Sequence, residues 1–149
     1  MDVNECMQKS KQLVRSFLPG WNVLYNSSRR VFGLTRYERR LIVLSKPYCK
    51  INSWKTIRLV VLHEVAHGLV GWEHAHDKVW KEKCLEIGGD GKIYIDIKAI
   101  KLPRGTHIAV CPVCGERYFR VRKPKKTRSC GKCCDVFSPD RILEYKEVV

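Results

Sequence analysis

The chain has 149 residues, of which 44% are hydrophobic, and it carries a formal net charge of +14. A chain of this size can bury one modest core and a small additional module. It contains no run of about 18 apolar residues, which argues against a membrane-spanning helix. The segment from Met1 to Glu5 is acidic, unlike the basic start of an export signal, so we expect a cytoplasmic protein without membrane contact.

The excess of basic residues is the strongest feature of the composition. Such a charge attracts phosphate backbones and acidic surfaces, which makes nucleic acid the first partner to consider. Basic residues that are scattered over a surface can instead serve solubility alone. The distinction therefore depends on where the 29 Lys and Arg residues cluster.

Hydrophobic periodicity predicts the secondary structure of the first third of the chain. Residues 2–18 have apolar side chains at helical spacing and are followed by Pro19-Gly20, which predicts an amphipathic helix. The residues after it alternate between strand formers and turn formers. We expect three strands in a small antiparallel sheet, at residues 21–25, Arg30–Arg36 and Arg39–Leu44, with a turn at 26–28.

The next segment predicts a helix that is buried on most sides, because its residues are almost continuously apolar. Asn52 or Ser53 can cap its start. Gly68 and Gly71 give the helix a place to end and the chain a place to turn back.

Two histidines of this helix, His63 and His67, are four residues apart and lie one turn apart on the same face. Their ring nitrogens can therefore point at one metal ion. Glu64 follows directly, where a carboxylate can take a proton from a metal-bound water without ligating the metal, as in the H-E-x-x-H arrangement of zinc peptidases. Chance or a structural role is the alternative, but burying these groups without partners is costly and a metal ion offsets that cost.

A catalytic zinc takes three protein ligands and keeps one position for water, so a third ligand must come from elsewhere. His74 and His76 are the candidates, and Asp77 favours His76 because it can cap the following helix and hold residue 76 at its entry. The metzincin spacing would require Gly and His in place of Val70 and Glu73, so this subclass is excluded. His74 is left as a solvated loop residue or as one that faces the metal site or substrate.

A second helix is predicted from His76 to Ile87, where Gly88-Gly89 ends it. Its expected inward positions are Val79, Trp80, Cys84, Leu85 and Ile87. Three isolated cysteines are interpreted as buried small apolar residues, namely Cys6, Cys49 and Cys84. After this helix, residues 91–100 alternate as a strand would.

A second module is predicted after a linker at residues 102–105. It contains two C-x-x-C pairs with fifteen residues between them, which is the spacing of a four-thiolate zinc ribbon. The predicted ligands are Cys111, Cys114, Cys130 and Cys133. A disulfide or redox role for these cysteines is the alternative. The acidic start of the chain disfavours it, because that start is unlike an export signal and disulfides are typical of exported proteins. Cys134, next to Cys133, can compete as a zinc ligand. In so short a module the zinc would supply much of the folding free energy.

The basic residues cluster between the two cysteine pairs, and no acidic residue interrupts residues 117–132. Basic side chains along a backbone, with aromatic rings beside them, hold single-stranded nucleic acid without sequence preference. The residues predicted to bind it are Arg117, Tyr118, Arg120, Arg122, Lys123, Lys125, Lys126 and Arg128. Alternatively, Tyr118 and Phe119 form the core of the module and the basic residues form a solvated loop.

The segment from about Trp21 to Gly89 resembles the SprT-like metalloprotease domain. The resemblance lies in His63-Glu64-Val65-Ala66-His67, in His76-Asp77-Lys78-Val79-Trp80 and in the terminal Ile87-Gly88-Gly89. It implies that His76 is the third zinc ligand, because in that family an aromatic residue, here Trp80, follows this histidine by four positions. Asp77 stands where the family usually has Gly. Zinc ribbons follow the protease domain in many members, so the resemblance extends over about residues 20–135.

Together with the predicted elements, the resemblance implies an α+β fold. A small zincin-like metalloprotease domain at residues 1–103, with helices packed on a short antiparallel sheet, would be followed by a zinc ribbon with a basic loop at 104–149. The resemblance also implies two Zn²⁺ ions, one catalytic and one structural, with Glu64 as general base. The implied substrates are proteins bound or crosslinked to DNA, with DNA controlling access to the cleft. We expect a monomer that is nucleoid-associated in a bacterial or viral setting and nuclear in a eukaryote.

Two other functions stay open. The first is a nucleic-acid-binding adaptor in which zinc is purely structural. The second is a general peptidase that DNA does not activate and whose positive charge selects acidic substrates. The intact Glu64 favours a protease over the adaptor, because a structural zinc site has no need of that carboxylate. The residue that stabilises the oxyanion is open among His74, Tyr37 and an Arg. An edge strand can align an extended substrate, but which strand does so cannot be read from the pattern.

Overall fold

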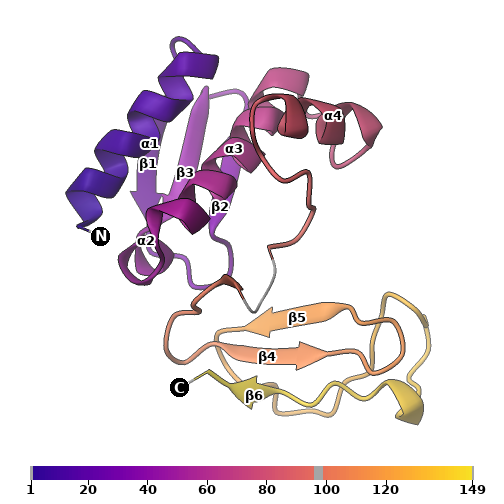
Figure 1. Cartoon of the computed structure of the whole chain (residues 1–149). Helices are drawn as coiled ribbons and strands as arrows, with labels where there is room; N and C mark the ends of the chain where they lie inside the picture. The colour runs from indigo at the N-terminus through magenta and orange to yellow at the C-terminus, as the bar shows by residue number, and fades with distance from the viewer. Residues whose placement is uncertain (1, 96–98, 149) are drawn as a thin grey trace. The chain divides into compact units, whose positions relative to one another are not determined.

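The computed structural model describes residues 2–95 and 99–148 and divides into two compact units, Met1–Lys101 and Leu102–Val149 (Figure 1). Within the described residues, the first unit combines helices with a three-stranded sheet, and the second is built on another three-stranded sheet. The α+β class predicted from the sequence is confirmed. No helix in these ranges is long and apolar enough to cross a membrane.

The sheet of the first unit contains β1 (Asn22–Asn26), β2 (Gly33–Arg36) and β3 (Leu41–Ser45) in the order β1-β3-β2. β2 and β3 form an antiparallel hairpin. β1 pairs with the other edge of β3 in parallel orientation, with Val23 opposite Ile42. The prediction of a wholly antiparallel sheet is therefore wrong for β1.

The parallel pairing follows from the course of the loop at residues 27–32. This loop crosses the end of β3 instead of folding β2 directly onto β1. Two hydrogen bonds hold it there: the backbone N–H of Ser45 donates to the carbonyl of Phe32 (2.7 Å), and the Ser45 hydroxyl donates to the carbonyl of Ser28 (2.5 Å). The second predicted strand consequently loses its first residues to the loop and begins at Gly33.

Each α-helix described in this unit follows directly after a residue whose side chain caps its N-terminus. They are α1 (Val3–Phe17), α2 (Lys46–Ile51), α3 (Trp54–Val70) and α4 (Lys78–Glu86), capped by Asp2, Ser45, Ser53 and Asp77. α2 was not predicted, although Pro47 in its first turn is typical of a helix start. Because α1 contacts β1, α3 contacts β2 and the two helices contact each other, both cover the same face of the sheet.

α3 is buried on most sides, as its apolar sequence predicts. Its buried residues are Ile57, Val60, Val61, Leu62, Glu64, Val65, Ala66 and His67. The helix continues through Gly68 and ends before Gly71, whose φ of 89° suits glycine. Gly68 therefore does not end the helix as expected. Its missing side chain instead makes room for Leu18, whose Cδ1 lies 2.6 Å from where a Cβ would be.

α4 is shorter than the predicted range 76–87. Trp80 and Cys84 are buried, but Val79 and Leu85 are 45% and 51% exposed, so their predicted inward orientation is wrong. A short helix that packs on one neighbour buries a single stripe, and positions 80 and 84 occupy it. The three isolated cysteines are all buried as predicted, at Cys6, Cys49 and Cys84.

The strand predicted at residues 91–100 is absent from 91–95 and 99–100, and residues 96–98 lie outside the described ranges. The chain is tied back instead by Asn52, a buried residue between α2 and α3. The side-chain amide of Asn52 donates to the carbonyl of Lys101 (2.9 Å), and its side-chain oxygen accepts from the Lys101 N–H (2.8 Å). Both backbone polar groups of Lys101 are thereby satisfied without a strand.

The second unit contains β4 (His107–Val110), β5 (Arg117–Arg120) and β6 (Lys146–Glu147) in the order β5-β4-β6, with both pairs antiparallel. A 3-10 turn, η2 (Pro139–Arg141), precedes β6. The core consists of Ala109, Cys111, Cys130 and Leu143, with Tyr118 and Tyr145 packed against it. A core of this size does not stabilise a module unaided, which agrees with the expectation of a structural metal.

Candidate metal centres

Three imidazole rings converge in the first unit. His63 and His67 project from one face of α3, and His76 comes from the loop just before α4. The Nε2 atoms of His63 and His67 lie 3.3 Å apart, and each lies 3.1 Å from Nε2 of His76. The structure therefore brings together the three histidines predicted from the sequence.

The triangle of nitrogens has the dimensions of a zinc site. A Zn–N bond of about 2.0–2.1 Å in tetrahedral geometry puts two ligand nitrogens about 3.3–3.4 Å apart. A ring nitrogen carries either a hydrogen or a lone pair, so three nitrogens at this mutual distance cannot all serve as hydrogen-bond partners for one another. A cation among them would satisfy all three, and the donor set fits zinc.

The surroundings keep these rings neutral. Burial, and then the charge of His76, lower the pKa of His63 to about 4. Burial, and then the charges of the other two histidines, lower the pKa of His67 to about 4, and burial also lowers the pKa of His76. Because a metal binds unprotonated imidazole, the cluster can accept one at neutral pH without releasing protons from its rings.

Trp80 packs against all three imidazoles, with ring centroids 4.6, 5.3 and 4.7 Å from those of His63, His67 and His76. It is fully buried, and its indole N–H donates to the carbonyl of His63 (3.5 Å). Its backbone N–H donates to the carboxylate of Asp77 (3.0 Å), which caps α4 as predicted. The cap therefore also fixes the wall against which the imidazoles pack.

His74 does not join the cluster. Its Nδ1 lies 2.8 Å from the carboxylate of Asp77, on the loop ahead of α4. Of the two histidines considered for the third position, only His76 faces His63 and His67. His74 supports the capping carboxylate instead.

Glu64 is 7% exposed and lies on the side of α3 that faces the sheet. Its carboxylate oxygen Oε2 accepts a hydrogen bond from the hydroxyl of Thr35 on β2 (2.7 Å). Burial raises the pKa of Glu64 to about 7, and the Thr35 hydrogen bond acts in the opposite direction. Such a carboxylate can accept and return a proton near neutral pH. Thr35 was missed from the sequence, because nothing local to it indicates that β2 lies against α3.

Tyr37, one of the residues considered for the oxyanion, lies within the electrostatic range of Glu64. Burial raises the pKa of Tyr37, with a smaller contribution from the negative charge of Glu64. Its phenol therefore keeps its proton at neutral pH and can donate a hydrogen bond.

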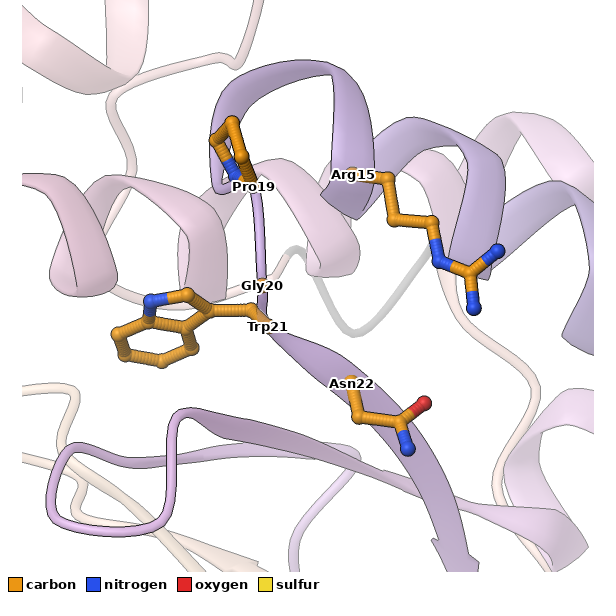
Figure 2. A pocket seen from close by; sticks show the side chains of 5 residues that line it. All are labelled: Arg15, Pro19, Gly20, Trp21 and Asn22. Atoms are coloured by element: carbon orange, nitrogen blue, oxygen red, sulfur yellow. The ribbon is translucent and has the colours of Figure 1, made fainter.

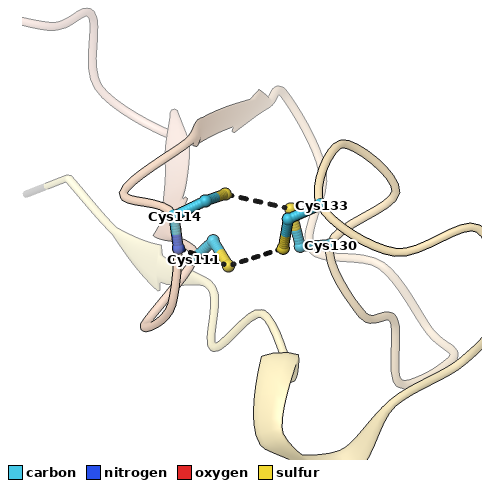
Figure 3. Close-up of side chains that lie close together, drawn as sticks. All are labelled: Cys111, Cys114, Cys130 and Cys133. Carbon is cyan, nitrogen blue, oxygen red and sulfur yellow. Dashed lines mark hydrogen bonds between the residues drawn. The ribbon is translucent and has the colours of Figure 1, made fainter.

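Four cysteines of the second unit converge in the same way (Figure 3). The Sγ atoms of Cys111 and Cys133 lie 3.8 Å apart, and those of Cys114 and Cys130 lie 3.6 Å apart, with all four thiols free. A tetrahedral zinc with Zn–S bonds of about 2.3 Å separates its sulfurs by about 3.8 Å, so this cluster also fits zinc. Cys134 is not one of the converging residues.

Tyr118 is part of this cluster's surroundings. Its hydroxyl lies 3.1 Å from Sγ of Cys130, and this hydrogen bond lowers the pKa of the Cys130 thiol to about 6 while it raises the pKa of Tyr118 to about 12. The ring of Tyr118 packs against the core of the unit. Ring and hydroxyl are both engaged within the unit, which disfavours the predicted role of Tyr118 in stacking on nucleic-acid bases.

Among the basic residues predicted to bind nucleic acid, the exposed ones follow β5. Five of them are exposed, namely Arg122, Lys123, Lys125, Lys126 and Arg128. Arg117 and Arg120 are half-buried on β5 itself, and Lys132 pairs with Glu116. The accessible positive charge of the predicted binding residues is thus concentrated at residues 122–128.

An open hollow of about 440 Å³ lies where α1 leads into β1 (Figure 2). It is lined by Arg15, Pro19, Gly20, Trp21 and Asn22. The guanidinium of Arg15 and the indole of Trp21 point away from each other in Figure 2. The hollow is lined by neither the histidines nor Glu64, so it is separate from the candidate metal centre.

Residues 3–99 of the chain match the model of the SprT-like family. The matched region includes α1 to α4, the three converging histidines and Glu64. The match confirms the resemblance that rests on the histidine motifs. No curated protein and no solved structure matches the chain.

The lowered imidazole pKa values predict how the histidine cluster binds zinc as the pH changes. A ring whose pKa is lowered to about 4 stays unprotonated down to that pH, so protons compete with zinc only as the pH falls towards it. We expect the affinity to be constant between about pH 8 and 6 and to fall below about pH 5, whereas ordinary histidines would weaken binding already near pH 6.5. Chelator competition over a pH series measures the affinity, with His76→Ala as the control that lacks this site. A marked loss of affinity before the pH reaches about 6 would contradict the expectation.

Proposed function

This chain belongs to the SprT-like family, whose members generally resemble metallopeptidases, and on that premise we propose that it is a zinc-dependent endopeptidase. The observation that carries the proposal is the convergence of three neutral imidazoles, two of which project from α3, the helix that also carries the buried carboxylate of Glu64. A structural zinc site has four protein ligands and needs no proton acceptor. This cluster offers three ligands, and Glu64 follows one of them, His63, directly in the chain, which suits hydrolysis of a peptide bond.

In the proposed reaction, a zinc ion held by His63, His67 and His76 would act as a Lewis acid on the scissile carbonyl and would make water more acidic. Glu64 takes a proton from the attacking water on a carboxylate oxygen and later delivers that proton to the nitrogen of the leaving amine. A carboxyl pKa of about 7 suits both transfers, because neither protonation state is strongly favoured near neutral pH. Tyr37 is a neutral donor for the oxyanion.

We assign the alignment of the substrate to β2. This strand lies at an edge of the sheet, contacts α3 and reaches Glu64 through Thr35. Its outer edge has no neighbouring strand within the described sheet, and an extended peptide can add to such an edge by main-chain hydrogen bonds. A peptide added there runs beside the carboxylate.

The cysteine cluster would hold a second, structural zinc. Four cysteine ligands complete the coordination of the ion and leave no position for water. The small core of the second unit supports this role, because binding of the ion then contributes to folding.

Single-stranded DNA is the partner that we propose for the second unit. Residues 122–128 include five Lys and Arg and no acidic residue, and the chain as a whole carries a charge of +14. Cations at this density displace the counterions of a phosphate backbone. The proposed substrates are proteins bound or crosslinked to DNA, and the DNA stimulates their cleavage. The enzyme is proposed to act as a monomer, associated with the nucleoid in a bacterial or viral setting and located in the nucleus of a eukaryote.

Two zinc ions per chain are expected in the purified protein, and elemental analysis measures them. His63→Ala should reduce the number to one because it removes a ligand from the histidine site, and Cys130→Ser should do the same at the cysteine site. We expect only Cys130→Ser to lower the melting temperature of the second unit, because that unit depends on its metal. A wild-type chain that binds a single zinc would rule out one of the two assignments.

Cleavage of a basic DNA-binding protein is expected to depend on both single-stranded DNA and Glu64. Glu64→Gln keeps the shape of the side chain and both metal sites but cannot accept a proton, so we expect it to lower kcat by about 10²–10⁴-fold while zinc content and DNA affinity stay unchanged. Gel assays with and without single-stranded DNA, on the added protein and on the chain itself, measure the effect.

The other outcomes of this assay separate the alternatives. Equal cleavage with and without DNA would reject DNA stimulation and identify a general peptidase. A wild type that holds two zinc ions and binds DNA but cleaves nothing would reject the protease and identify an adaptor.

Neutralising the basic segment is expected to weaken single-strand binding for all sequences alike. The variant combines Arg122→Gln, Lys123→Gln, Lys125→Gln and Lys126→Gln. If all four side chains contact phosphates, the slope of log K against log salt should become shallower by up to about 3. A matched control neutralises four exposed lysines of the first unit, Lys46, Lys50, Lys55 and Lys81. If both variants change the slope equally, only the overall charge matters and residues 122–126 are not the binding site.

A further inference from the structure

The hydroxyl of Thr35 has two possible acceptors, and both belong to Glu64. Thr35 Oγ1 lies 2.7 Å from Oε2 of the Glu64 carboxylate and 3.0 Å from its backbone carbonyl oxygen. Thr35 is 9% exposed, so no bulk water competes strongly for the hydroxyl. The Thr35 hydroxyl therefore bonds to a single residue of α3, Glu64.

The carboxylate is the better acceptor of the single hydroxyl proton. The carbonyl oxygen of Glu64, in the interior of α3, already accepts the N–H of the residue four positions on. The shorter distance to Oε2 is typical of a hydroxyl that donates to an ionised carboxylate, which is the stronger of the two bonds. Oε2 is consequently held, and the rotation of the carboxylate about its last bond is restricted.

Gly33, two residues earlier on the same face of β2, leaves space at the other carboxylate oxygen. A Cβ on Gly33 would lie 2.9 Å from Oε1 and 2.9 Å from Cγ of Glu64, and 2.8 Å from Cγ1 of Val60. No side chain other than hydrogen fits there without displacing Glu64. One strand thus supplies a hydrogen-bond donor at Oε2 and, at Gly33, no side chain against Oε1.

We propose that Thr35 is the positioning residue of the general base: it holds Oε2 of Glu64 so that Oε1 is the oxygen that receives the proton of the attacking water. This inference rests on the proposed peptidase function and deepens it. A purely structural role, in which Thr35 only joins β2 to α3, predicts a loss of stability without a specific loss in kcat.

The first readout is independent of activity and uses the zinc-loaded full chain. The ¹³C resonance of the Glu64 side-chain carboxyl, assigned by its disappearance in Glu64→Gln, reports the hydrogen bond directly. We expect it to move in Thr35→Val, which keeps the shape of the side chain without the hydroxyl, and to stay in place in Thr35→Ser. Thr35→Ala serves as a second variant without the hydroxyl in case Val does not fold. A resonance that is unchanged in Val or Ala would overturn the proposal.

The second readout is the kinetics of peptide cleavage at equal zinc content. We expect Thr35→Val to lower kcat by about 10- to 100-fold with little change in KM, because the base is present but poorly oriented, and Thr35→Ser to recover most of the rate. Thr56→Val is the matched control. It removes a hydroxyl from the start of α3, the helix that carries Glu64, and the hydrogen-bond partner of that hydroxyl is Ser53. Its kcat should equal that of the wild type.

The outcomes distinguish this inference from the function on which it rests. A wild type without cleavage defeats the peptidase proposal and with it the positioning role of Thr35. A wild type that cleaves, with Thr35→Val equally fast or with Thr35→Ser as slow as Thr35→Val, leaves the peptidase intact and overturns the positioning role alone.

Discussion

The first unit depends on how α3 accommodates polar groups inside an apolar environment. The helix is buried on most sides, and a carboxylate and two imidazoles would be costly there without partners. The Thr35 hydroxyl binds Glu64, and Nε2 of His63 and Nε2 of His67 face His76 across a space that fits a cation. β2 and the entry to α4 deliver these partners, so the packing of the fold and the assembly of the candidate site are the same event.

The features that sequence reasoning could predict are those set by local spacing. Residues four apart on a helix share a face in any protein, which is why His63 and His67 were identified before their surroundings were known. The cysteine pairs likewise restrict which sulfurs can share an ion. Asp77 selected His76 through capping, which is also a relation between near neighbours in the chain.

The features that escaped prediction depend on contacts between distant segments. The parallel pairing of β1 requires that residues 27–32 cross the end of β3, and an alternating pattern contains no information about such a crossing. Thr35 is an ordinary strand residue until β2 packs on α3. The sequence left Tyr118 open between stacking on bases and packing in the core of the module, and only its contacts with that core and with Cys130 distinguish the two. In each case one pattern is compatible with two environments.

The loop that crosses β3 also bears on the order in which the first unit folds. β2 and β3 are joined by the short turn at residues 37–40, so their pairing closes a small loop at low entropic cost. β1 has no edge to pair with until β3 is ordered, and its parallel pairing joins segments farther apart in the chain. We therefore expect the hairpin that contains Gly33 and Thr35 to form ahead of β1, so that the support for Glu64 exists before the sheet is complete.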